Sequence, residues 1–291
     1  MAVITDDLDL PAARRFSLWT AIRRNPTIAI GAALLAALVF MAIFAPYLAT
    51  VDPLKIAPVN RLRPPSERWW FGTDQFGRDI YSRTLYGARV SLIVGLSVAA
   101  ISSLLGLALG LACGYFRRVD ALVMRVMDGL MAIPSILLAI ALITLTRPGL
   151  GIVIVAIVIP EVPRIVRVVR AVVLSIRSQP YVESAIAGGT KNMKLLLRHV
   201  LPNALAPLIV QSTYVCASAM LVEASLSFLG AGVPPEIPSW GNIIAQGRSF
   251  FQIAPWTILI PGAFLAVTVL AVNLLGDGLR DRLDPRLARR L

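Results

Sequence analysis

The chain has 291 residues, of which 57% are hydrophobic and 15% are charged, and its mean hydropathy is +0.76. Soluble domains have about 45–50% apolar and about 25% charged residues, so this composition excludes a disordered chain and argues against a soluble two-domain enzyme. The net charge of +12 is typical of nucleic-acid-binding proteins, but here the basic residues lie between apolar runs, which indicates membrane orientation and no nucleic-acid partner.

Six apolar runs are long enough to cross a membrane, since a spanning helix needs ~20 residues. The first run, 27–49, follows a tail of residues 1–26, and we read it as a retained helix because no small-residue cleavage site follows it. A hydrophilic segment, 50–87, follows the first run. After it come a core of five further runs, 88–277, and a tail, 278–291. The runs within the core are 88–116, 121–146, 150–173, 205–229 and 254–275. The pattern predicts an all-α polytopic membrane protein with six transmembrane helices.

The positive charges predict that both termini are cytoplasmic. With this orientation, most of the 28 Lys and Arg residues fall in the four inner segments, as the positive-inside rule requires. The segment 50–87 is then extracytoplasmic, although it is itself basic. We expect Thr73 and Ser239 outside the cell, and Ser178 and Arg286 inside.

Small residues and a proline mark two of the runs. Gly106, Gly110 and Gly114 have the spacing i, i+4, i+8, which lets helix backbones approach closely. They form either a packing face or glycines that a membrane helix merely tolerates. Pro134 removes a backbone donor in the third of the six runs, 121–146, and favours a kink there.

Residues suited to catalysis or metal binding are scarce. Cys113 and Cys216 lie in apolar runs without a CxxC neighbour, and His199 is the one histidine. The sequence contains neither a GxxxxGK[ST] phosphate loop nor an HExxH motif. We therefore expect no catalytic residue, no metal site and no bound cofactor in this chain.

The most informative segment lies between the fourth and fifth runs. Pro180 suits the first turn of a short helix, and the pair Gly188-Gly189 would end it. Thr190 would then cap a second helix that runs to Pro202. A short helix with small residues, exposed beside the membrane, is suited to docking into a groove of a partner protein.

The same segment resembles the EAA signature of the membrane subunits of ATP-binding-cassette importers. The resemblance rests on Glu183-Ser184-Ala185, then Gly189, then Leu201-Pro202. Further motifs of one branch of this family extend it over about residues 69–287; they are residues 71–79, 86–89, 132–135, 223–230, 238–242 and 273–281. The ordered set is similar to the C-type permease subunit of dipeptide, oligopeptide and nickel importers.

This resemblance implies the type I importer permease architecture, in the cell membrane, with several partners. They are a homologous second permease, two ATPase subunits that use ATP and Mg, an extracytoplasmic solute-binding protein and the lipid bilayer. The chain would form half of a pathway for peptides, or alternatively for nickel or another small solute. A secondary transporter is the alternative class, but it should show internal repeats. The residues that would couple to an ATPase subunit are Tyr181, Glu183, Ser184, Ala185, Gly189 and Pro202. No substrate-binding residue is assigned.

Several charged residues near the runs have two interpretations. Arg167 and Arg170 resemble an Arg-x-x-Arg pair of the family, and they would contact either the ATPase subunit or lipid at the inner leaflet. Arg164 is additional to that pair, and Glu161 is unexpected within a membrane run. Glu223 lies deepest in an apolar run, and we favour a structural carboxylate bonded to Ser225, Ser227 or a neighbouring helix.

The outer loop 230–255 is a candidate surface for the solute-binding protein. Trp240, Arg248 and Phe251 lie in it, and Arg and aromatic residues are enriched in protein interfaces. The rival interpretation places the aromatic residues in the lipid headgroup layer, where Trp and Tyr gather.

Overall fold

The computed structural model describes residues 26–146 and 149–283, and in this part the regular structure is helical. An isolated bridge pairs Thr73 with Asp79. The helices are α2 (Pro26–Ile43), α3 (Ala45–Leu48), η1 (Pro58–Asn60), α4 (Ile80–Tyr115), α5 (Arg117–Met131), α6 (Ser135–Thr144), α7 (Leu150–Arg177), α8 (Pro180–Ala187), α9 (Asn192–Leu195), the π-turn η2 (Leu196–Val200), α10 (Leu201–Phe228), α11 (Trp240–Gly247), η3 (Arg248–Phe250) and α12 (Trp256–Leu283). The prediction of an all-α protein is confirmed. The predicted tails, with Arg286, lie largely outside the described residues.

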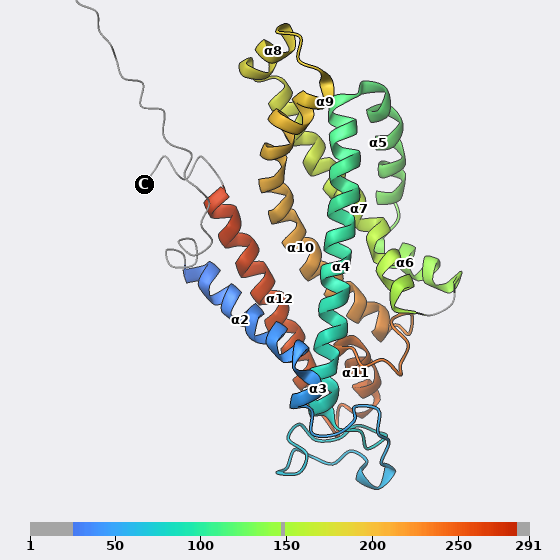
Figure 1. The fold of residues 1–291 in the computed structure, drawn as a ribbon. Helices are drawn as coiled ribbons and strands as arrows, with labels where there is room; N and C mark the ends of the chain where they lie inside the picture. The colour runs from blue at the N-terminus through green and yellow to red at the C-terminus, as the bar shows by residue number, and fades with distance from the viewer. Residues whose placement is uncertain (1–25, 147–148, 284–291) are drawn as a thin grey trace, which may run out of the picture.

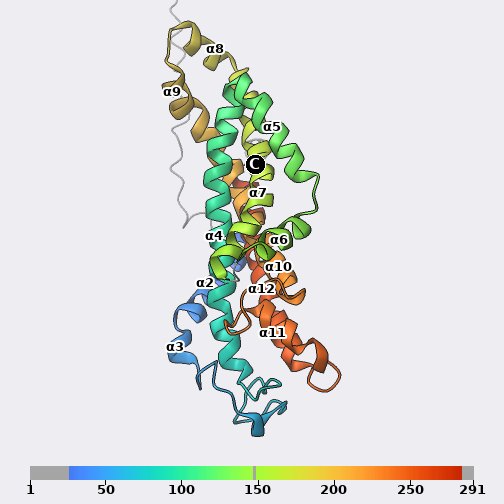
Figure 2. The same ribbon diagram turned by 90° about the vertical axis from the view of Figure 1, so that its right-hand side faces the viewer.

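The molecule is elongated, and the segments at its two ends come from different parts of the chain. Figure 1 places α8 at one end and the loop-rich segment between α3 and α4 at the other, with α4, α7 and α10 running between them. Figure 2 shows the same separation from the side. The two segments are therefore separated by the length of the helix bundle.

Four described helical segments are long and apolar enough to cross a membrane: Pro26–Ile43, Ile80–Tyr115, Asn192–Phe228 and Trp256–Arg282. A fifth is added if the pair α5 and α6 counts as one span. The chain is therefore a multi-pass membrane protein. The count of six stays a prediction, because α7, although 28 residues long, carries several charged residues.

Two predicted boundaries differ from the structure. The run 121–146 is not one helix, because α5 and α6 meet at a bend of 89°. Pro134 lies at this break, where it lacks an N–H group and disfavours helical geometry in the residue before it. The helix α4 begins at Ile80 and not at residue 88, because the Asp79 carboxylate caps it by accepting the Ser82 backbone N–H at 2.9 Å.

The interface between α4 and α7 forms much of the core. A Cβ atom added at Gly106, Gly110 or Gly114 would lie within 2.4 to 2.6 Å of an α7 side chain. Those side chains belong to Ile165, Val169 and Val173. The glycines are thus a packing face, one of the two interpretations open from the sequence.

The first helix packs along the last one. A Cβ at Gly31 of α2 would lie 2.9 Å from the Ala271 carbonyl oxygen of α12, so the two backbones nearly touch. Figure 1 shows α2 and α12 side by side, diverging from the rest of the bundle toward the end that carries α8. The Tyr214 hydroxyl on α10 donates to Asp277 on α12 and so ties this pair of helices to the bundle.

Candidate functional site

The helix α8 matches the short helix predicted between the fourth and fifth runs. Pro180 is its first residue, and the chain leaves it through Gly188 and then Gly189, which has φ +76. A Cβ at Gly189 would meet nothing within 4 Å of the described chain, so space is not what requires glycine there. The positive φ is the reason for glycine, since other residues rarely adopt this conformation.

The segment after Gly189 differs from the prediction in two ways. Thr190 is not the capping residue: Lys191 occupies that position, and no side chain caps α9. The second helix does not end at Pro202 but continues through the π-turn Leu196–Val200 into α10. Pro202 lies in the first turn of α10 and brings no N–H donor, so the bonding pattern changes just before it.

The surface of α8 and its neighbours is apolar as well as exposed. Val182 is fully buried and anchors the helix, whereas Tyr181 and Ile186 are 48% and 45% exposed. Met193 and Leu197 on the following segment are 67% and 55% exposed. This apolar surface lies at one extreme end of the molecule, together with two lysines and an arginine, Lys191, Lys194 and Arg198. Exposed apolar patches of this kind mark interaction sites.

The predicted coupling residues do not all contribute to this surface. Glu183 and Ser184 are exposed on α8, where the Ser184 hydroxyl donates to the Pro180 carbonyl oxygen at 2.8 Å. Ala185 is half-buried. Pro202 is exposed in the first turn of α10, just after the π-turn.

At the opposite end, Trp240 is a core residue and not a surface residue. Its side chain is fully buried, and its indole Nε1–H donates to the Thr84 carbonyl oxygen of α4 at 3.0 Å. Ser239 caps α11 by accepting the Asn242 backbone N–H at 3.1 Å, and this start of the helix turns Trp240 toward the bundle. The expectation that Trp240 docks a partner is therefore wrong.

Arg248 and Phe251 remain on the surface. Arg248 is exposed, donates to the Phe228 carbonyl oxygen at 2.9 Å and lies 5.4 Å from the centre of the Phe228 ring. The Phe251 side chain is 48% exposed. Both residues follow α11 directly, at the end of the molecule opposite α8.

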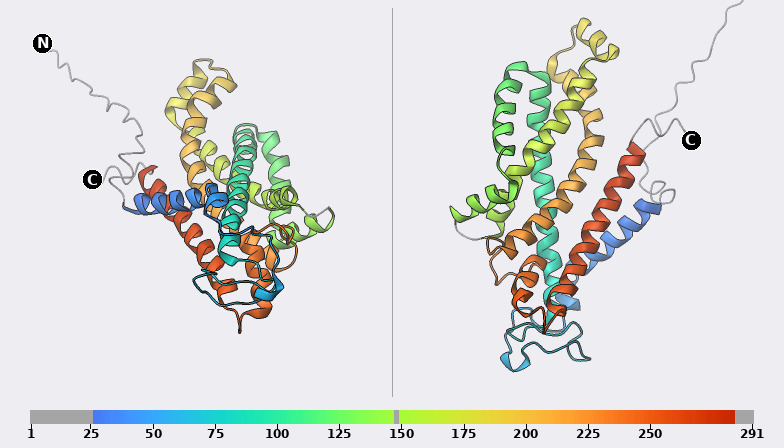
Figure 3. Two further views of the ribbon diagram at one scale, coloured as in Figure 1. Left: turned by 60° about the horizontal axis from the view of Figure 1, so that its bottom comes forward. Right: turned by 180° about the vertical axis from the view of Figure 1, so that it is seen from behind.

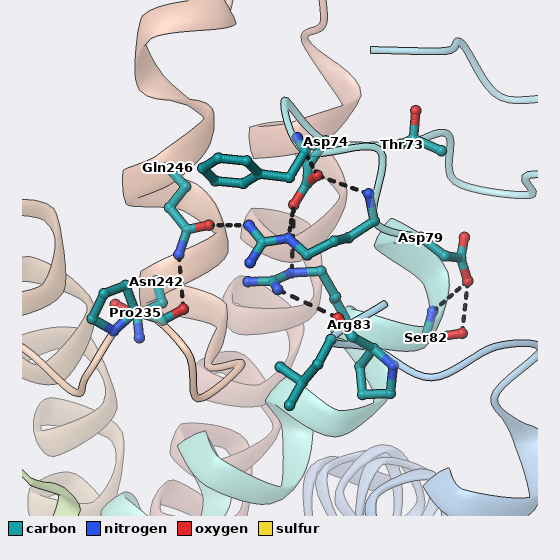
Figure 4. A network of polar contacts seen from close by, with 12 residues as sticks. Thr73, Asp74, Asp79, Ser82, Arg83, Pro235, Asn242 and Gln246 are labelled. Carbon is teal, nitrogen blue, oxygen red and sulfur yellow. Dashed lines mark hydrogen bonds and ion pairs between the residues drawn. The ribbon is translucent and has the colours of Figure 1, made fainter. Parts of the chain in front are cut away.

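A polar network that the sequence did not indicate joins the outer segment to α11 (Figure 4). The Asp74 carboxylate accepts from Arg78 Nε at 2.6 Å and lies 3.8 Å from Nε of Arg83, which is fully buried. Arg78 also donates to the Gln246 side chain at 2.5 Å. The network fixes the loop before α4 against the loop that carries Arg248. Asp74 and Arg78 lie in the motif 71–79, and this motif was the one sequence feature that could have drawn attention to the network.

The buried carboxylate of Glu223 has structural partners. Glu223 is fully buried, and its Oε1 accepts from Ser227 at 2.9 Å and from Ser239 at 2.8 Å, in agreement with the structural interpretation. Ser225 instead donates to the Leu221 carbonyl oxygen.

The two arginines of the Arg-x-x-Arg pair bind within the chain. Arg167 donates to Asp128 at 2.6 Å, and Arg170 donates to both carboxylate oxygens of Asp120 at 2.5 and 2.7 Å. They connect α7 to α5. Contact of these arginines with an ATPase subunit or with lipid stays a prediction.

Comparison with known proteins agrees with these features. Residues 102–289 match the family model described as binding-protein-dependent transport system inner membrane component. Residues 16–65 match the N-terminal TM domain of oligopeptide transport permease C.

Three relatives align over nearly the whole chain. A probable peptide ABC transporter permease protein of Sinorhizobium fredii is 58% identical over 92% of this chain and 92% of its own length. The dipeptide transport system permease protein of Alkalihalophilus pseudofirmus is 43% identical, over 91% and 88% respectively. The oligopeptide transport system permease protein of Bacillus subtilis is 36% identical, over 97% and 94%.

A solved structure shares the fold. A chain of the inward-facing MetNI methionine ABC transporter superposes with a TM-score of 0.51 and 22% identity, covering 67% of this chain and 94% of that chain. The arrangement of helices is thus that of an importer permease. Together with the family model and the relatives, it establishes that the chain belongs to the inner membrane components of binding-protein-dependent transport systems.

Proposed function

We propose that this chain is one of two permease subunits of an ATP-driven peptide importer and forms half of its translocation pathway. The support is that relatives named for peptide, dipeptide and oligopeptide transport align with at least 91% of the chain. None of these three is named for nickel, which leaves nickel as the weaker alternative. Membership of a binding-protein-dependent family argues against a secondary transporter.

The observation that carries this proposal is the exposed apolar surface of α8 and of the segment that follows it. Tyr181, Ile186 and Met193 are apolar and exposed at one extreme end of a membrane protein, where a second protein is needed to cover them. An ATPase subunit is the partner we propose, with Glu183 at the interface. Closure of two ATPase subunits on ATP and Mg would then move α8, and with it α7 and α10, between inward-open and outward-open states.

The orientation that suits this function has both termini in the cytoplasm. The helix α8 would face the cytoplasm, and residues 50–79 with the loop 230–255 would face the extracytoplasmic side. The separation of these segments at opposite ends of the molecule supports this arrangement. Arg248 and Phe251 would then meet the solute-binding protein, and the network around Asp74 would hold their loop in place.

Purification and uptake test the proposal. We expect this chain to co-purify with a second permease and two ATPase subunits, and to have no ATPase activity alone. In a deletion strain, complementation with the gene should restore ATP-dependent uptake of peptides. The assay compares uptake of dipeptides, tripeptides, longer peptides and nickel. Restoration of nickel uptake alone would contradict the peptide assignment, and uptake that persists without the ATPase subunits would contradict the importer assignment.

A further inference from the structure

The half of α7 that leads to α8 presents an unusual face for a helix of a membrane protein. Its exposed positions include Arg164, Arg167, Ala171 and Ser175, which lie within about 80° of one another around the helix, and Leu174, which is 42% exposed and borders this face next to Arg167. Exposed positions on α2 are instead large and apolar, such as Phe40, which is 56% exposed. Figure 3 (right) shows this region of α7 between α5 and α10. At Arg164 and Arg167 this face is charged, where a lipid-facing surface should be apolar.

The position of Arg164 along the helix sharpens the contrast. It lies 13 residues before the end of α7 at Arg177, which is about 20 Å at 1.5 Å per residue. The next residue, Ile165, packs against Gly106 in the interior of α4, so Arg164 is at mid-bundle depth. Its side chain is 55% exposed. A charged side chain that faces lipid at this depth is costly, so the face must meet water or protein.

A carboxylate accompanies this arginine. Arg164 Nη1 donates to Glu161 Oε2 at 3.3 Å, and the Ser218 hydroxyl on α10 donates to Glu161 Oε1 at 3.4 Å. Both contacts are long for charge-assisted hydrogen bonds, which are about 2.7–2.9 Å between nitrogen and oxygen. Glu161 is nearly buried at the contact of α7 with α10, with an exposed side-chain fraction of 6%. The pair is therefore loosely bound and open on the arginine side.

The charge balance of this face favours water over a second protein. Arg167, one turn from Arg164, pairs with Asp128, and the two side chains are 45% and 59% exposed. Each of the two arginines thus has a carboxylate in its own chain, and the face needs no counter-charge from a partner. Exposed ion pairs of this kind are well accommodated in water, where they contribute little to stability.

We propose that Glu161 and Arg164 line the translocation pathway and bind the charged ends of a zwitterionic cargo. This inference rests on the proposed peptide importer. The ammonium group of a peptide would replace Arg164 beside Glu161, and the peptide carboxylate would bind the released guanidinium. The exchange breaks one ion pair and forms two, so a peptide can pass without leaving Glu161 or Arg164 unpaired. The Ser218 hydroxyl on α10 is the second hydrogen-bond partner of the Glu161 carboxylate.

The first experiment tests whether the face is wet. In the purified whole transporter, Arg164→Cys is treated with a membrane-impermeant, charged thiol reagent. Val155→Cys is the matched control: Val155 is 53% exposed on the same helix, but it lies nine residues away and so about 180° around it, among apolar residues. The native Cys113 and Cys216 are buried. We expect Arg164→Cys to react at least tenfold faster than the control. Equal rates would overturn the water-lined face, whatever the cargo is.

The second experiment tests recognition of the cargo. Uptake of a tripeptide with free ends and of its N-acetylated form is measured with Glu161→Gln, each relative to wild type. We expect uptake of the free peptide at low concentration to fall about tenfold, while uptake of the acetylated form is unchanged. Glu223→Gln is the control, because that carboxylate is buried away from this face, and it should affect both peptides equally.

The outcomes separate this inference from the proposed function. An equal loss for both peptides in Glu161→Gln would overturn the contact with the ammonium group and leave a structural role. Failure of the wild-type transporter to import any peptide would overturn the proposed function itself, while the labelling result would still decide whether the face is wet.

Discussion

Single glycines decide how closely α4 and α7 approach. At Gly106 the nearest atom to an added Cβ would be Ile165 Cγ2 at 2.4 Å, which is closer than real Cβ contacts come. The side chain of Ile165 is fully buried and has no free space into which to move. The absence of a methyl group at one position thus sets the distance between two helices.

We expect Gly106→Ala to lower the free energy of unfolding by about 1–3 kcal/mol, the usual cost of overpacking. Gly262→Ala on α12 is the matched control, because a Cβ there meets nothing within 4 Å. Thermal denaturation of the purified transporter in detergent measures both. A Gly106→Ala variant as stable as the control would show that the interface can expand without loss.

The indole of Trp240 fixes α11 against α4 through the hydrogen bond to the Thr84 carbonyl oxygen. Trp240→Ala should therefore cost about 3–5 kcal/mol of stability, as for other large buried side chains. Normal stability of Trp240→Ala would contradict its core position.

Arg248→Glu should leave stability nearly unchanged, because Arg248 is exposed. It should instead weaken the stimulation of ATPase activity by the loaded solute-binding protein, and more strongly at low salt.

At the scale of elements, α8 depends on the turn that follows it. Gly188 has φ −75, which suits any residue, whereas its neighbour Gly189 has φ +76. Two adjacent glycines therefore differ in what they tolerate, and the difference is one of backbone conformation alone, since neither Cβ would meet a close contact.

We expect Gly189→Ala to destabilise the turn by about 1–2 kcal/mol, the cost of a left-handed conformation for a residue with a side chain. Transport should fall, while ligand binding by the solute-binding protein is unaffected. Gly188→Ala is the control and should transport at nearly the wild-type rate. Gly189→Asn should recover part of the activity, because Asn tolerates this conformation better than Ala. Equal activity of the Gly188→Ala and Gly189→Ala variants would refute the role of the turn.

At the scale of the whole molecule, local sequence signals predicted local structure well. Pro180 and the glycine pair 188–189 located α8, and the glycine spacing offered, as one of two interpretations, the face that packs against α7. Features set by contacts between distant segments were not predictable in the same way. Trp240 reads as an interfacial aromatic until α4 is known to lie beside it, and nothing in the sequence pairs Arg170 with Asp120, 50 residues earlier.

The predicted orientation can be tested at better positions than those chosen from the sequence. Thr73 and Ser239 are fully buried, so cysteines there would be shielded on either side of the membrane. Val59, which is 86% exposed, replaces them as the outer position, and Ser178 is exposed near α8 as the inner one. In intact cells, an impermeant thiol reagent should label Val59→Cys and not Ser178→Cys. The reverse pattern would invert the topology.

The ion pairs between α5 and α7 also bear on how the protein enters the membrane during synthesis. The ribosome releases α5 first, so Asp120 and Asp128 emerge before Arg167 and Arg170 exist to neutralise them. Unpaired carboxylates are costly in the bilayer. Because α5 has one charged face and one apolar face, it can lie in the membrane interface until α7 has been synthesised. We therefore expect α5 and α7 to insert together, with the pairs Asp120–Arg170 and Asp128–Arg167 already formed, once translation has passed α7.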